Sequence, residues 1–158
     1  MWNRISQSFP SRPVGRRTLV LSSHGRLPSP DRGDGDPGRY NLGIYRMQII
    51  ARDRAIIRWL PMRGGAAHHR MWQARGLEMP VAVVIGADPA TLIAAVTPAP
   101  EGVSELSLSG MINDRRVGLS PCKSIELHVP ASSEIVLDGT VSPNETAEEG
   151  PFGDHDEA

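Results

Sequence analysis

The apolar residues of this 158-residue chain occur in short runs that glycine, proline or charged residues interrupt. One wholly apolar run, residues 81–85, lies between Pro80 and Gly86, as expected for a strand that is buried on both faces. A helix that crosses a membrane needs about 20 consecutive apolar residues. No run approaches that length, so the sequence predicts a soluble or membrane-peripheral protein built from short elements.

Short strands and helices follow one another without a strict repeat. Two β-prone runs, residues 42–50 and 56–60, flank the polar Arg52-Asp53-Arg54 turn and predict a β-hairpin. Asp88-Pro89 supplies an N-cap and a first-turn proline for a helix through residue 95. Further helices are predicted at residues 66–75 and 104–111, and further strands at residues 117–119, 124–129 and 134–141. This mixed order indicates an α+β or α/β domain around a mainly antiparallel sheet or barrel.

Charge and cysteine content exclude several classes of function. The formal net charge is -1, whereas nucleic-acid binders usually carry a marked basic excess, so we expect no nucleic-acid partner. The single cysteine, Cys122, excludes an internal disulfide and a cysteine-based zinc site, and it agrees with a reducing compartment.

The two ends of the chain differ from its middle. Residues 1–30 hold five arginines and no acidic residue among many serines and prolines, a composition that predicts disorder for residues 1–38. An organelle transit peptide has a similar composition, and a disrupted or misread gene start is a third interpretation. The polar residues 142–158 predict a loop, of which residues 156–158 form a tail.

Several polar residues suggest binding chemistry from their types alone. Arg58 and Arg63 lie near Gly64-Gly65, and arginines beside glycines can bind phosphate, although surface arginines beside turn glycines are also ordinary. His68 and His69 are adjacent, so on a helix they point to different sides and at most one is a metal ligand.

Two carboxylates near the end of the chain form a second candidate pair. Glu149 and Asp154 are five residues apart around a Gly-Pro-Phe-Gly turn, a spacing that lets them converge from a loop. Paired carboxyls can separate in pKa, which leaves one protonated as an acid. From the residue types alone, a solvated acidic tail is the favoured interpretation.

A series of motifs resembles one known family. Residues 41–46 are similar to its N-x-G-x-Y-R segment and residues 58–65 to its R-W-L-x-x-R-G-G segment. Further matching segments follow in the same order, at residues 80–86, 86–90, 98–105, 129–131, 134–139 and 149–155. Together they resemble the UbiD family of prenylated-flavin decarboxylases from about residue 36 to residue 155. The resemblance implies a truncated flavin-binding domain at residues 39–155, with a split β-barrel and short flanking helices.

The resemblance also implies cofactors. Family members bind prenylated FMN with a divalent metal, usually manganese, and often potassium. Asn41 and Glu105 match the metal-binding positions, and His68 matches a metal-contacting histidine of part of the family, with His69 as the competing choice. The positions that match the cofactor lining are Ile44, Tyr45, Arg46, Arg58, Trp59, Leu60, Arg63 and Gly64.

Catalysis in the family uses one arginine and two carboxyls, which fall here on Arg46, Glu149 and Asp154. The implied reaction is the non-oxidative decarboxylation of an aromatic carboxylic acid. Arg46 would hold Glu149 and orient the substrate carboxylate, and Asp154 would protonate the carbon that lost CO₂. Within the family, the resemblance is strongest to members that decarboxylate 4-hydroxy-3-polyprenylbenzoate in ubiquinone biosynthesis.

The wider expectations follow from the family as well. A prenylated-flavin synthase would supply the cofactor, the full-length protein would be a homo-oligomer, and the location would be cytoplasmic, with peripheral contact to the inner membrane through a lipophilic substrate. Family members extend further at both ends, and Asp154 here lies four residues from the end of the sequence. A non-catalytic flavin-binding or assembly remnant is therefore the alternative function, and an unstable degenerate product is a third.

Overall fold

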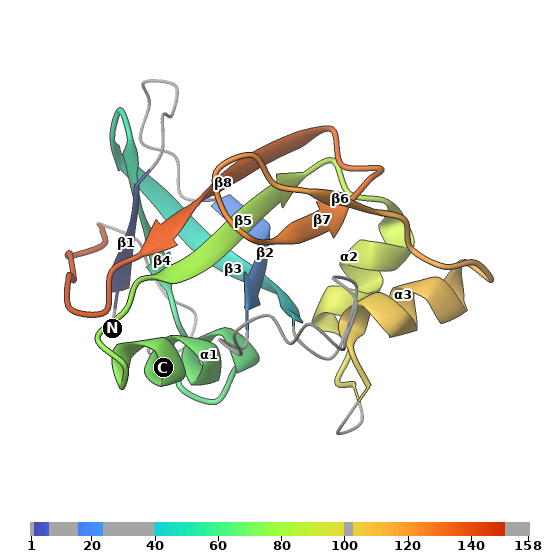
Figure 1. Ribbon diagram of the computed structural model, residues 1–158, viewed down its shortest axis with the longest axis horizontal. Helices are drawn as coiled ribbons and strands as arrows, with labels where there is room; N and C mark the ends of the chain where they lie inside the picture. Colours follow the sequence, from blue (N-terminus) through green and yellow to red (C-terminus); the bar gives the residue numbers. More distant parts are fainter. Residues whose placement is uncertain (1, 7–15, 24–39, 100–102, 151–158) are drawn as a thin grey trace.

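The computed structural model describes residues 2–6, 16–23, 40–99 and 103–150. Within them, six strands are hydrogen-bonded in the order β1-β4-β3-β2-β5-β8 and form a closed barrel (Figure 1). The strands are β1 (Trp2–Ser6), β2 (Arg16–Ser23), β3 (Tyr40–Ala51), β4 (Arg54–Arg58), β5 (Met79–Ile85) and β8 (Ile135–Val141). The closing contact between β1 and β8 is the pair Ile5 and Val141. The predicted mixed α/β domain is confirmed, and the split form of its barrel stays a prediction.

Strand β3 carries four of the candidate site residues, Asn41, Ile44, Tyr45 and Arg46. It pairs antiparallel with β2 on one side and with β4 on the other, so the predicted hairpin is confirmed. Trp59 and Leu60, which were expected in the second strand of this hairpin, follow the end of β4 at Arg58. The register of β3 against β4 shifts between Ile49 and Ala51, where a bulge bends the strand.

Strand β5 is buried on both faces, as its apolar sequence predicts. Val81 and Val83 belong to the interior cluster of the barrel, which also contains Tyr45. Ala82 and Val84 belong to a second cluster on the outer face, together with Leu42. The sheet therefore separates two apolar layers, and alternate residues of each strand contribute to different layers.

The helices lie at two places around the barrel (Figure 1). Helix α1 (Gly64–Gln73) lies at one end of it and contacts β3, β2 and β5. Helices α2 (Pro89–Val96) and α3 (Glu105–Ile112) pack against each other to one side, near the two-stranded sheet of β6 (Leu119–Pro121) and β7 (His128–Pro130). No helix in the described part of the chain is long and apolar enough to cross a membrane.

Helix boundaries differ from the predictions where tertiary contacts decide them. Helix α1 begins at Gly64, two residues earlier than predicted, because Gly64 and Gly65 pack against side chains of the barrel. Strands β6 and β7 are shifted toward the C-terminus relative to the predicted runs, and β7 is also shorter than predicted.

Strands β1 and β2 lie inside the segment of residues 1–38 that the composition predicts to be disordered, so for these residues the prediction differs from the structure. β2 lies between β3 and β5, and β1 lies beside β4. Composition is averaged over a long segment, whereas a short strand is stabilised by partners far away in the sequence. The predicted disorder of the rest of residues 1–38 falls largely outside the described residues.

Candidate cofactor and catalytic site

The start of helix α1 is packed against the side chain of Asn41 on β3. The Asn41 amide nitrogen donates a hydrogen bond to the Tyr45 hydroxyl at 3.1 Å, and the Gly65 N–H donates to the same hydroxyl at 2.9 Å. A Cβ atom at Gly64 would lie 1.9 Å from the Asn41 Oδ1. Glycine at this position is therefore required for the close approach of α1 to β3.

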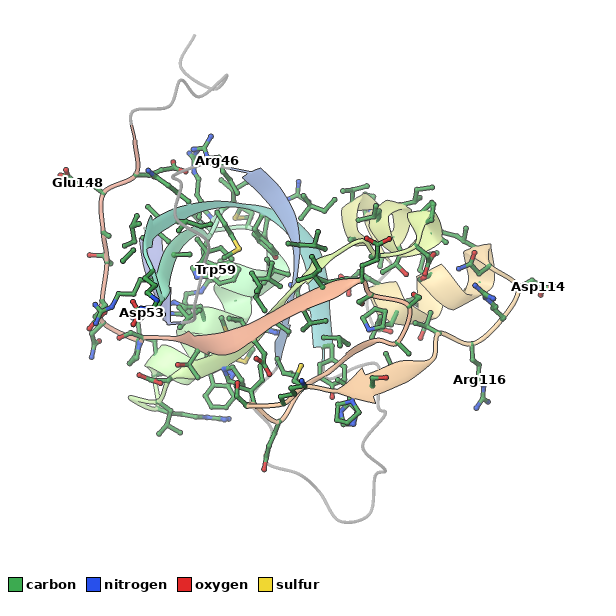
Figure 2. All side chains as sticks on the ribbon, turned by 90° about the horizontal axis from the view of Figure 1, so that it is seen from above. Arg46, Asp53, Trp59, Asp114, Arg116 and Glu148 are labelled. Atoms are coloured by element: carbon green, nitrogen blue, oxygen red, sulfur yellow. The ribbon has the colours of Figure 1, made fainter. Side chains whose placement is uncertain are left out.

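Trp59 packs on the same helix start from inside the barrel (Figure 2). Its ring meets the Tyr45 ring edge to face at 4.9 Å, and a Cβ atom at Gly65 would lie 2.4 Å from the Trp59 ring. The Trp59 Nε1 is buried and has no hydrogen-bond acceptor among the described residues. A buried donor without an acceptor costs about 1–3 kcal/mol, so this atom marks a place where an acceptor is needed.

Several predicted site residues influence the pKa of the Tyr45 hydroxyl. Burial raises the pKa of Tyr45, and the charge of Glu105 raises it further, whereas the hydrogen bonds from Asn41 and Gly65 and the charge of Arg63 lower it. The net result is a pKa above the ordinary value, so Tyr45 stays protonated at neutral pH. Glu105 and Arg63 are thus close enough to Tyr45 to act on it from two different elements.

Glu105 lies at the start of α3, where Ser104 caps the helix by accepting a hydrogen bond from the Ser107 N–H at 3.1 Å. The Glu105 Oε2 accepts a hydrogen bond from the Leu42 N–H at 3.4 Å. The fold therefore brings Glu105 to Leu42, the residue that follows Asn41, although Glu105 and Leu42 are 63 residues apart in the sequence.

The two adjacent histidines are both buried in α1. The His69 Nε2 lies 3.2 Å from the Ser142 carbonyl oxygen, and its ring stacks on Trp59 at 6.4 Å. A carbonyl only accepts, so this nitrogen carries the proton and is not free to bind a metal. The metal role of His68 stays a prediction. Among the described residues, no three His, Cys, Asp or Glu side chains are grouped to hold a metal ion.

Arg46 and Glu149 form a bidentate ion pair. The Arg46 Nε donates to the Glu149 Oε1 at 2.8 Å, and Nη2 donates to Oε2 at 2.7 Å. The Glu149 side chain is only 6% exposed, whereas that of Arg46 is 23% exposed. Figure 2 shows Arg46 at the edge of the barrel, on the side where the segment that carries Glu148 passes. The geometry has the parallel fork that strong guanidinium–carboxylate pairs adopt.

The other predicted residues are distributed around these two groups. Ile44 packs against the outer apolar cluster, and Leu60 is exposed. Arg58 ends β4, and Arg63 precedes α1 as its N-cap residue. Asp154 lies outside the described residues. The structure thus brings Asn41, Tyr45, Gly64 and Glu105 together and pairs Arg46 with Glu149.

Two site residues were not predicted from the sequence. The Gln48 side chain forms two hydrogen bonds with the backbone of Gly150, and Gly65 provides an N–H to Tyr45. Gly65 could have been found from its place in the second matched motif. Gln48 has one local signal, its spacing of two residues from Arg46, which puts both on one face of β3.

A family model matches this geometry. The Rift-related domain of UbiD, described as 3-octaprenyl-4-hydroxybenzoate carboxy-lyase, matches residues 29–157. The chain therefore belongs to the UbiD family. The matched residues include both members of the Arg46–Glu149 pair and every residue of the Asn41 group.

Solved structures of UbiD-class enzymes are similar to the chain. HmfF from Pelotomaculum thermopropionicum, an evolved dimeric form in complex with prFMN, is 29% identical with a TM-score of 0.74, covering 89% of this chain and 31% of HmfF. Vanillic acid decarboxylase of Sedimentibacter hydroxybenzoicus in its closed form is 28% identical with a TM-score of 0.73, covering 95% and 29%. Apo 3,4-dihydroxybenzoic acid decarboxylase from Klebsiella pneumoniae is 26% identical with a TM-score of 0.67, covering 82% and 25%. The chain thus spans less than a third of the length of each of these proteins.

Proposed function

We propose that this chain forms the prenylated-FMN-binding part of a non-oxidative decarboxylase that acts on an aromatic carboxylic acid. The observation that carries the proposal is the bidentate pair of Arg46 and Glu149. These residues occupy two of the three catalytic positions that the family motifs imply. The fold joins them across 103 residues of sequence and leaves the Glu149 side chain only 6% exposed.

The residues near α1 fit a flavin phosphate group. The N-terminus of α1 is the positive end of a helix dipole, which favours an anion. Arg63 adds a positive charge close to Tyr45. The buried Trp59 Nε1 is a donor that a polar group of a bound cofactor could satisfy.

Asn41 and Glu105 suit a divalent metal, because amide and carboxylate oxygens are hard ligands. Two protein ligands do not complete a coordination sphere, so phosphate oxygens of the flavin would supply further ligands, with His68 as an additional protein candidate. This donor set agrees with Mn²⁺ as the divalent ion, and we include K⁺ as a second ion of the same site.

Arg46 orients the substrate in this proposal. Glu149 accepts hydrogen bonds from the Nε–H and from one N–H of Nη2. The guanidinium would also bind the substrate carboxylate, because its planar fork matches carboxylate geometry. Glu149 fixes the plane of the guanidinium and thereby the angle of the bound carboxylate. When bound, prenylated FMN would supply an electron-accepting centre for the electron pair of the broken C–CO₂ bond. Asp154 would deliver a proton to the carbon that lost CO₂.

The substrate in this proposal is a 4-hydroxybenzoate with a polyprenyl group at position 3. Vanillic acid and 3,4-dihydroxybenzoic acid, which the neighbours' names give as substrates, share a 4-hydroxybenzoate core, as does the compound in the family description. Such a substrate belongs to ubiquinone biosynthesis and would bring the protein to the surface of the inner membrane. The proposal includes a split barrel, a prenylated-flavin synthase as cofactor supplier and a homo-oligomeric full-length protein.

Cofactor retention tests the proposal. The chain is purified after co-expression with a prenylated-flavin synthase, and its absorbance spectrum and manganese content are compared with those of Asn41→Ala plus Glu105→Ala. We expect about one flavin per chain in the wild type and its loss in the double variant. The matched control is Asn144→Ala plus Glu126→Ala, which removes the same side-chain types at exposed positions and should retain the flavin.

The remaining outcomes separate the two functions. Flavin retention with CO₂ release from a 4-hydroxybenzoate, and loss of that release in Glu149→Gln, would support the decarboxylase. Flavin retention without CO₂ release would favour the alternative, a non-catalytic flavin-binding remnant. This alternative is included because the chain covers only 31% of HmfF and 29% of vanillic acid decarboxylase. A folded chain that retains no flavin would contradict the proposal.

A further inference from the structure

The side-chain amide of Gln48 forms two hydrogen bonds with the backbone of Gly150, the residue after Glu149. Its Oε1 accepts a hydrogen bond from the Gly150 N–H at 3.2 Å, and its Nε2 donates to the Gly150 carbonyl oxygen at 3.4 Å. Gly150 has a φ of 141°, a backbone conformation that residues with a side chain rarely adopt. The contact therefore requires an amide on β3 and a glycine after Glu149.

Two side chains of β3, those of Arg46 and Gln48, hold two consecutive residues, Glu149 and Gly150. Arg46 and Gln48 are two residues apart on a strand, so their side chains project from the same face. Arg46 holds the side chain of Glu149, while Gln48 holds the backbone of Gly150. A single ion pair leaves a segment free to rotate about the paired groups, whereas a second attachment one residue later fixes its direction.

Two side chains of β3 hold the end of the described chain to the barrel. Residues 145–150 form no helix or strand, and Arg46 and Gln48 hydrogen-bond to residues 149 and 150. Before this segment, the Gln73 amide donates a hydrogen bond to the Pro143 carbonyl oxygen at 2.8 Å. The position of the Glu149 carboxylate thus depends on the two side chains of β3.

We infer that Gln48 is a positioning residue, which holds the backbone at Gly150 so that the Glu149 carboxylate meets Arg46 in the bidentate geometry. Its importance for catalysis rests on the proposed function, but its effect on Glu149 can be measured without a cofactor. Gln48 does not contact the reacting groups in this account, and it acts through Glu149.

The first test is hydrogen exchange of the Gly150 N–H together with the NMR resonance of the Arg46 Nε–H. Gln48→Met keeps the length of the side chain and removes both hydrogen bonds, so Gly150 should exchange about 10-fold faster and the Arg46 resonance should shift. The control is Gln73→Met, the same substitution at a residue that hydrogen-bonds to Pro143, which comes before this segment. It should leave both signals of Gly150 and Arg46 unchanged.

Rescue by protonation provides a second readout. Gln48→Glu keeps the acceptor for the Gly150 N–H, but its ionised carboxylate has no donor for the Gly150 carbonyl. A protonated carboxyl has both, so the carbonyl-carbon NMR shift of Gly150 should return toward its wild-type value as the pH falls through the glutamate range, at about pH 4–5. Gln48→Met should show no such recovery, because a thioether does not titrate.

Activity completes the test. If the wild type retains flavin and releases CO₂, Gln48→Met should lower kcat about 10-fold or more, with flavin retention and KM little changed. Unchanged exchange at Gly150 would overturn the inference, and so would faster exchange with unchanged kcat, which would leave Gln48 a purely structural residue. If the wild type retains no flavin, the proposed function fails on that spectrum alone. The Arg46 resonance in Gln48→Met then decides whether Gln48 positions Glu149.

Discussion

Gly64→Ala is predicted to displace Asn41, because the added methyl group occupies the space of its amide oxygen. The new Cβ would lie 1.9 Å from the Asn41 Oδ1 and 2.8 Å from its Cγ, whereas ordinary contacts begin at 3.4 Å. The oxygen would have to move by about 1.5 Å to reach ordinary contact. The amide nitrogen of Asn41 is bonded to the Tyr45 hydroxyl at 3.1 Å, so this movement breaks or strains that bond.

The magnitude follows from three opposing effects. Alanine is better than glycine inside a helix by up to about 1 kcal/mol, so Gly64→Ala would stabilise α1 if the space were free. Overpacking costs about 1–3 kcal/mol, and the loss of the Asn41–Tyr45 hydrogen bond costs about 1 kcal/mol more. We therefore expect the free energy of unfolding to fall by about 1–3 kcal/mol. If Asn41 is a metal ligand, the affinity for Mn²⁺ should fall at least about 10-fold.

Urea unfolding measures the stability of the variant, and a Mn²⁺ titration followed by electron paramagnetic resonance measures the affinity. The matched control is Gly118→Ala, whose new Cβ would lie 3.8 Å from the Ala131 Cβ, an ordinary contact. Its stability should stay within about 0.5 kcal/mol of wild type. A Gly64→Ala chain that is as stable as wild type and binds Mn²⁺ equally well would refute the steric argument and the assignment of Asn41.

Two further predictions concern groups remote from the site. The Asp88 carboxylate accepts hydrogen bonds from Ala90, Thr91 and Asn113, so Asp88→Ala should lower the free energy of unfolding by about 1–2 kcal/mol at pH 7. Burial raises the pKa of Asp88, but the hydrogen bonds from Thr91, Asn113 and the Ala90 N–H outweigh it and lower the pKa. The stabilisation by the Asp88 carboxylate is thus complete above its unfolded-state pKa and is lost as the pH falls through its folded-state pKa. If urea titrations showed the same loss of unfolding free energy in Asp88→Ala at pH 7 and at pH 2, this reasoning would be contradicted. Burial, aided by the charge of Asp138, raises the pKa of Cys122 to about 11, so iodoacetamide should label it about 100-fold more slowly at pH 8 than an ordinary thiol. Labelling at the rate of a free thiol peptide would show that the thiol is not buried in this way.

Local signals predicted the elements whose determinants lie close together in the sequence. The Asp88 carboxylate accepts from the backbone N–H groups of residues 90 and 91, as an N-cap should, and Ser104 caps α3 in the same way. The β3–β4 hairpin follows from two β-prone runs around a short polar turn. Each of these signals involves a few neighbouring residues, so the surrounding fold was not needed to interpret them.

Strands β1 and β2 were missed because their stability depends on distant partners. β2 pairs with β3 and β5, and β1 pairs with β4 and β8. A segment rich in arginine and serine has a composition typical of disorder, yet a run of about five residues is enough to add a strand to an existing sheet. Gln48 was missed for the same reason, since its partner Gly150 is 102 residues away.

The sequence by itself determined the family, through ordered motifs, and it determined the local elements through caps, turns and apolar runs. The tertiary structure alone decided that the Arg46 fork meets Glu149 across 103 residues, that Asn41 lies against Gly64, and that Gln48 holds Gly150. A motif specifies residue types, whereas a hydrogen bond or a steric contact requires two atoms within about 3 Å of each other. That distance is set by the pairing of β3 with its neighbours and by the packing of α1 on the barrel, both of which are properties of the folded chain.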